Sequence, residues 1–158
     1  MNWQQLCQDP TFQNLPYKIE LNEQGQVIMS PTGLIHGKYQ FKIGSFILKL
    51  MRETGEVITE CAIQTAEGTK VVDVAWFSSQ RWEQVKDKYD TPIAPEICIE
   101  VLSPSNTHAE MQTKRLLYFA AGAQEVWFCN EEGHLNFYDH QGKLPTSRLI
   151  PDFPKEID

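Results

Sequence analysis

The chain has 158 residues, of which 41% are hydrophobic and 22% charged, a composition typical of a globular protein with room for one domain and its own core. No apolar run approaches the roughly 20 residues that span a bilayer, and the polar start MNWQQLCQDP lacks the pattern of a secretory signal. The formal net charge of −7 counts against a broad basic surface for nucleic acid, although acids gathered around a metal also make a chain acidic.

The four cysteines are far apart in the sequence, and no two have the C-x-x-C spacing of a zinc or redox site. Cys98 and Cys129 lie in apolar runs and are expected to be buried free thiols. This cysteine usage indicates a reducing compartment, so we expect a cytoplasmic protein.

The N-terminal part predicts a β-hairpin followed by a long helix. Residues 17–31, YKIELNEQGQVIMSP, alternate apolar and polar side chains around the turn NEQG. From Leu34 to about Arg52 the apolar residues change to helical spacing. The positions that define this helical stripe are Ile35, Tyr39, Ile43, Phe46, Ile47 and Leu50.

Two strands and a short helix are predicted next. Residues 56–65, EVITECAIQT, alternate as a strand does, and 70–78, KVVDVAWFS, form a largely apolar strand. Residues 79–89 predict a short surface helix with Ser79 as its cap.

A buried strand over 96–102, EICIEVL, is followed by a helix from Thr107 to about Ala121. Thr107 and Glu110 have the spacing of a capping box, and Gly122 is a natural helix stop.

A second hairpin over 124–140 turns at NEEG, and the Pro-rich tail 144–158 is expected to be irregular. This order of elements predicts an α/β or α+β fold with one sheet and helices packed on it. We expect a single domain over 1–158 with its core at about 17–140.

Three charges stand where apolar residues are expected. Asp73 shares a strand face with Val71, Ala75 and Phe77, and Glu100 shares one with Cys98 and Leu102. Lys114 falls in the apolar sector of its helix, next to Met111, Leu117 and Tyr118. A buried carboxylate needs a cation, strong donors or a metal, so the three charges together predict a functional site.

Each charge also has a plainer interpretation. Asp73 could cap a loop at a strand end, and Glu100 could be the structural partner of an arginine or of Lys114. Lys114 could snorkel to water or form an exposed i, i+4 pair with Glu110.

The residues around these charges resemble the PD-(D/E)XK nuclease superfamily, and more closely its Uma-type family of restriction endonuclease-like proteins. The matching segments are MSPTGLIHG (29–37), VVDVAW (71–76), IEVLSPSN (99–106) and KRLLYFAAGAQEVWFC (114–129). The likeness extends from about Tyr17 to Tyr138.

The resemblance implies a restriction-endonuclease-like mixed central sheet flanked by helices, in the order α-β-β-β-α-β, with additional β-hairpins. It implies that Asp73 and Glu100 hold Mg²⁺ or Mn²⁺, with the main-chain oxygen of Val101 as a third contact. The superfamily lysine, two residues after the second acid, is replaced by Leu102, and Lys114 is the substitute that positions the attacking water.

Three further residues follow from the resemblance. His36, at the start of the long helix, is the candidate for the polar group that this helix contributes, and a core or capping role is the alternative. Gln40, one turn later, could share that role, and Glu20 stands where related chains carry an acid after the first strand.

The function expected from the sequence is that of a Mg²⁺-dependent DNA endonuclease, acting as a homodimer because two sites suit double-strand cleavage. One alternative is a catalytically inactive descendant that binds nucleic acid or protein. The other is an interaction domain in which the three charges form only a buried ion network.

Overall fold

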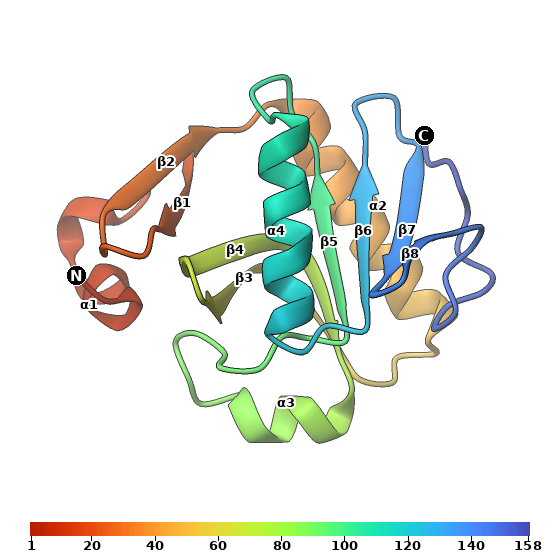
Figure 1. Cartoon of the computed structure of the whole chain (residues 1–158), viewed down its shortest axis with the longest axis horizontal. Coiled ribbons are helices and arrows are strands. Elements are labelled where there is room, and N and C mark those ends of the chain that lie inside the picture. The colour runs from red at the N-terminus through yellow and green to blue at the C-terminus, as the bar shows by residue number, and fades with distance from the viewer.

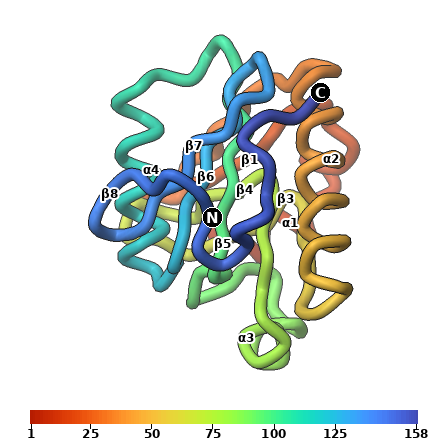
Figure 2. The backbone as a smooth tube through the Cα atoms, turned by 90° about the vertical axis from the view of Figure 1, so that its right-hand side faces the viewer, coloured from red at the N-terminus to blue at the C-terminus, as the bar shows by residue number.

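The computed structural model describes residues 1–158, and its centre is a six-stranded sheet covered by a helix on each face (Figures 1 and 2). Helix α2 (Leu34–Leu50) packs on one face and helix α4 (His108–Ala120) on the other. The strands, in their spatial order, are β3 (Glu56–Thr65), β4 (Gly68–Phe77), β5 (Ile97–Val101), β6 (Glu125–Cys129), β7 (Leu135–Asp139) and β8 (Gly142–Leu144).

The predicted α/β fold with a mixed sheet is confirmed. Strands β5 and β6 are parallel and all other neighbours are antiparallel. The parallel pair requires a crossover, and α4 supplies it, because a tight hairpin cannot join parallel strands. The expected order α-β-β-β-α-β is that of α2, β3, β4, β5, α4 and β6.

Two apolar layers enclose the sheet. Ile43 and Ile47 of α2 pack on Val74, Ile99 and other side chains of one face. Tyr118 of α4 packs on Ala75, Cys98 and others of the opposite face. The expected burial of Cys98 and Cys129 as free thiols is confirmed.

The predicted hairpins and long helices are found close to their predicted bounds. The capping box at Thr107 is present, and Gly122 follows α4 with a φ of +113° that favours glycine. One detail was wrong: α3 (Ser79–Val85) is capped by Ser78, which accepts from the amide of Arg81.

Three short elements were not predicted: α1 (Trp3–Gln8), a 3₁₀ turn (Pro10–Phe12) and β8. None of the helices combines the length and the apolar character that crossing a bilayer requires.

The N-terminal hairpin forms a separate two-stranded sheet. Strands β1 (Tyr17–Leu21) and β2 (Val27–Pro31) pair only with each other (Figure 1). The carboxylate of Glu20 fastens β1 to β4 by accepting from the amide of Val71 at 2.7 Å. This hairpin therefore borders the middle of β4, where the sequence places Asp73.

Strand β4 is irregular at Asp73. The ladder pairs Thr59 with Val74 and Cys61 with Val72, and leaves Glu60 and Asp73 between them unpaired. Glu60 has a φ of +53°, which is uncommon for a residue with a side chain. The predicted alternation is interrupted here, since Val72 and not Val71 joins the apolar layer with Ala75 and Phe77.

Candidate active site

Asp73 and Glu100 lie on neighbouring antiparallel strands in the interior. The register pairs Val74 with Ile99, and Asp73 and Glu100 each lie one residue beyond this last pair. Their side chains are only 1% and 3% exposed. The fold thus brings together the two acids that the sequence singled out.

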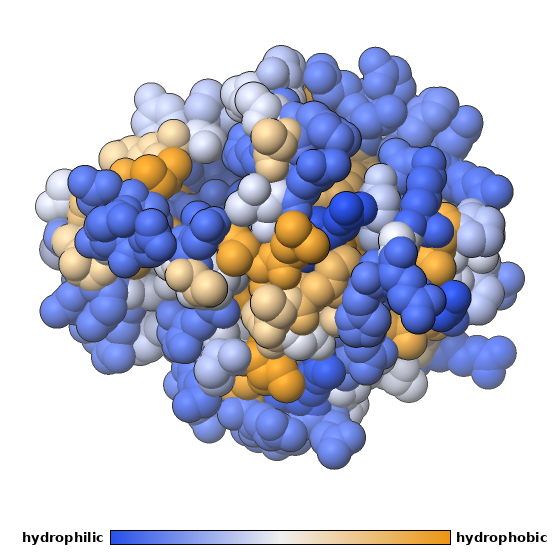
Figure 3. All heavy atoms as spheres, in the orientation of Figure 1, coloured by the Kyte–Doolittle hydropathy of each residue, from blue (hydrophilic) through white to orange (hydrophobic).

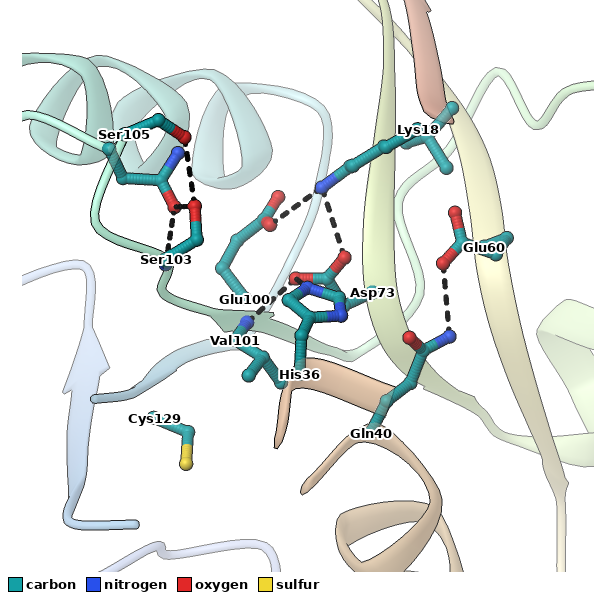
Figure 4. A network of polar contacts seen from close by, with 12 residues as sticks. Lys18, His36, Gln40, Glu60, Asp73, Glu100, Val101, Ser103, Ser105 and Cys129 are labelled. Atoms are coloured by element: carbon teal, nitrogen blue, oxygen red, sulfur yellow. Dashed lines mark hydrogen bonds and ion pairs between the residues drawn. The ribbon is translucent and has the colours of Figure 1, made fainter. Parts of the chain in front are cut away.

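A lysine that sequence analysis missed joins the two acids. The Nζ atom of Lys18, on β1, lies 3.1 Å from Asp73 Oδ1 and 3.0 Å from Glu100 Oε2 (Figure 4). One ammonium group therefore bridges both carboxylates.

Asp73 is held by two further groups. Its Oδ2 accepts from the amide of Val101 at 2.7 Å, and His36 Nε2 lies 3.3 Å from the same oxygen. Helix α2 thus places His36, the candidate from the sequence, in direct contact with Asp73 (Figure 4). Gln40, one turn later, instead donates to Glu60 at 3.0 Å.

Glu100 receives its other contacts from α4. The hydroxyl of Tyr118 donates to Glu100 Oε1 at 2.5 Å, and Lys114 Nζ lies 3.5 Å from that oxygen. Lys114 also donates to both oxygens of Glu20 at 3.0 Å. The predicted burial of Lys114 is confirmed, and its exposed pairing with Glu110 is wrong.

The two lysines do not fully balance the acids of the site, and His36 adds a positive charge beside Asp73 when it is protonated. Asp73, Glu100 and Glu20 supply three carboxylates, whereas Lys18 and Lys114 supply two ammonium groups. Burial raises the pKa of Glu100 to about 7, and Asp73 and Glu20 act in the same direction, against the two lysines. Glu100 is therefore the carboxylate that most needs a further positive charge.

In the other groups of the site, the neighbouring charges outweigh burial and favour the charged form. Burial opposes ionisation of Asp73, but Lys18 and His36 outweigh it and hold the pKa of that carboxyl well below its usual range. Burial also opposes the charge on Lys18 and on His36. Their carboxylate partners outweigh it and raise the pKa of both.

A cavity of about 20 Å³ opens beside these groups, lined among others by Lys18, His36, Glu100 and Lys114. It has room for about one water molecule or ion. No group of three or more His, Cys, Asp or Glu side chains is arranged to hold a metal. Mg²⁺ is nevertheless commonly bound by only one or two protein carboxylates, because it keeps several water molecules as its other ligands.

The turn after β5 shapes the edge of this cavity. The amide of Ser103 donates to Asn106 Oδ1 at 2.8 Å, which closes the loop that leads to α4. Leu102, in the position where the superfamily has its lysine, is half-buried and packs toward the apolar layer under α4.

Comparisons with known proteins agree with this architecture. The family model Uma2, described as "Putative restriction endonuclease", matches residues 3–150. A solved structure from Anabaena variabilis ATCC 29413, described as a putative nuclease belonging to DUF820, superposes with a TM-score of 0.75. That likeness covers 99% of this chain and 94% of the other at 19% identity, so it shows a shared fold. None of the curated proteins matches the chain.

Proposed function

Because the chain belongs to the Uma2 family of restriction endonuclease-like proteins, we propose that it is a DNA endonuclease that uses a divalent metal, Mg²⁺ or Mn²⁺, held by Asp73 and Glu100. The observation that carries the proposal is that one oxygen of each buried carboxylate faces the same cation, the ammonium group of Lys18. Carboxylates so placed suit a hard divalent ion.

The remaining ligands would be the main-chain oxygen of Val101 and water. Val101 lines the small cavity together with Glu100. Its amide donates to Asp73 at 2.7 Å, so residue 101 lies directly beside the first acid. A bound divalent ion would supply an acidified water as nucleophile and neutralise charge on the phosphate.

The other side chains have roles that follow from their contacts. His36 holds one oxygen of Asp73 and leaves the other free to face a cation. Tyr118 orients Glu100 in the same way. Lys114, fixed by Glu20 and lining the cavity, is placed to position the attacking water or the scissile phosphate.

A second function has its own support. Leu102 replaces the superfamily lysine, and every buried polar side-chain atom has a hydrogen-bond partner. Such a satisfied network also suits a catalytically inactive nuclease fold that binds nucleic acid or protein.

The deciding experiment is titration calorimetry with Mg²⁺ and Mn²⁺, followed by a cleavage assay on plasmid DNA. Asp73→Asn and Glu100→Gln keep the shape of each side chain and remove its charge, so both should lose metal binding and cleavage. Full cleavage by either variant would refute the assignment. Metal binding without cleavage in the unmodified protein would favour the inactive alternative.

A further inference from the structure

The ammonium group of Lys18 lies between Asp73 and Glu100, where a metal ion bound by both carboxylates would lie. This group lies at hydrogen-bond distance from both Asp73 and Glu100, and the Lys18 side chain is 9% exposed. We propose that Lys18 is a built-in counter-ion of the metal site, and that a divalent ion binds by displacing it. This inference rests on the proposed function, because it concerns how the same site takes up its metal.

The distances argue for displacement. A Mg²⁺ ion would lie about 2.1 Å from its oxygen ligands, whereas Lys18 Nζ lies 3.0 and 3.1 Å from the same two oxygens. Both cations would then lie within a few ångströms of each other in a buried site. Their repulsion is large where the effective dielectric constant is low.

Charge also favours exchange over addition. If a divalent ion joined Lys18 and Lys114, four positive charges would face the carboxylates of Asp73, Glu100 and Glu20, before any charge on His36 is counted. Release of Lys18 removes one of these positive charges from beside the metal.

Lys18 is the lysine whose two partners are the proposed metal ligands. It extends from the two-stranded β1–β2 sheet, which shares no strand ladder with the main sheet, and Figure 4 shows its long side chain entering the site from that side. Lys114, in contrast, is held on α4 by both oxygens of Glu20. Lys18 is therefore the cation that leaves, and Lys114 the one that remains.

Metal titration of three lysine variants tests the exchange. Lys18→Met removes the competing cation and should bind Mn²⁺ roughly tenfold more tightly than the unmodified chain, or better. Lys18→Arg keeps the charge and should stay weak. Lys114→Met removes a buried charge from the same cluster and measures the purely electrostatic gain, which should be smaller.

Unchanged or weaker binding by Lys18→Met, or an equal gain in Lys114→Met, would overturn the exchange. Binding by Lys18→Met alone would support it strongly. Absence of binding in every variant would refute the metal site itself and with it the proposed function.

A second measurement uses the unmodified protein and does not depend on a variant folding. The ¹⁵N-labelled ammonium group of Lys18 is followed by NMR during Mg²⁺ addition, with the Lys114 signal as the internal reference. Displacement should move or broaden the Lys18 signal at saturation and leave that of Lys114 largely in place. A Lys18 signal that survives saturation unchanged would contradict the proposal.

Discussion

At the residue scale, the site depends on how two lysines are divided among three acids. Lys18 forms ion pairs with Asp73 and Glu100, while Lys114 pairs with Glu20 and, at a longer distance, with Glu100. Glu20 also accepts from the amide of Val71, so it links the helix, the hairpin and the sheet. We therefore expect the Glu20–Lys114 pair to support the fold as well as the site.

Breaking that pair on one side should be costly. Glu20→Gln leaves the Lys114 ammonium without its main partner, so we expect it to lower the free energy of unfolding by about 3 kcal/mol. Adding Lys114→Met should recover part of the loss, because the orphaned charge is then gone. Urea unfolding of both single variants and the double variant gives the coupling.

The exposed pair of Glu83 and Lys86, with an N–O distance of 2.7 Å, provides the control. Glu83→Gln should change stability very little, because water screens an exposed pair. Additive losses in the Glu20 and Lys114 variants would show that the two side chains act independently.

The residues predicted from the sequence are those that break an apolar pattern. Asp73, Glu100 and Lys114 interrupt buried faces, and periodicity exposes such interruptions. Lys18 breaks no pattern, because a charged residue fits the polar face expected of a hairpin strand. Its burial arises from the packing of β1 beside β4, a tertiary contact that local periodicity does not encode.

At the element scale, helix α4 contributes side chains to two neighbouring sites. Lys114 and Tyr118 point into the acidic site, while Arg115 borders a larger cavity of about 440 Å³ between α4 and strands β6 to β8. Asn106 lines both cavities, so the larger one adjoins the site. Figure 3 looks onto this side of the molecule, where hydrophobic side chains at the centre are bordered by hydrophilic ones.

The larger cavity has the chemistry of a nucleic-acid contact. Its lining contains no Asp or Glu, although the chain has 21 of them. Arg115 stacks over the ring of Tyr138 at 4.4 Å, and Lys143 lies nearby; neither forms a salt bridge. Free cations suit phosphates, and an aromatic ring suits a base.

We predict that DNA bound to the site also contacts this cavity. Arg115→Gln and Lys143→Gln should each weaken binding of a short fluorescent DNA about tenfold or less, measured by anisotropy without metal so that no cleavage intervenes. Lys49→Gln, an exposed lysine on α2 in the opposite layer, is the matched control. An equal loss in the control would indicate non-specific charge attraction only.

The elements missed by sequence analysis are short ones. Helix α1 has six residues and β8 has three, too few for periodicity to emerge. A signal for α1 was nevertheless present, since Asn2 and Gln5 form a capping box. Strand β8 forms because β7 offers an open edge, and that depends on the assembled sheet.

At the scale of the whole molecule, the outer side of α2 is unexpectedly apolar. Its inner side packs on the sheet through Tyr39, Ile43 and Ile47. Leu34, Phe41 and Leu48 are 97%, 74% and 43% exposed, and they recur every seven residues along the helix. Side chains seven apart form one stripe on a helix, as in helix pairs that associate through such a seam.

We predict that the homodimer expected for double-strand cleavage forms through this stripe. A twofold axis across α2 would bring the same stripe of each copy together, since a symmetric interface is self-complementary. Phe41→Glu should then convert a dimer into a monomer in sedimentation velocity and leave the fold unchanged by circular dichroism, because Phe41 lies outside the core. Leu116→Glu, at a 65% exposed position on α4, is the control and should remain dimeric. A protein that sediments as a monomer before any substitution would contradict the homodimer. A dimer that survives Phe41→Glu would place the interface elsewhere.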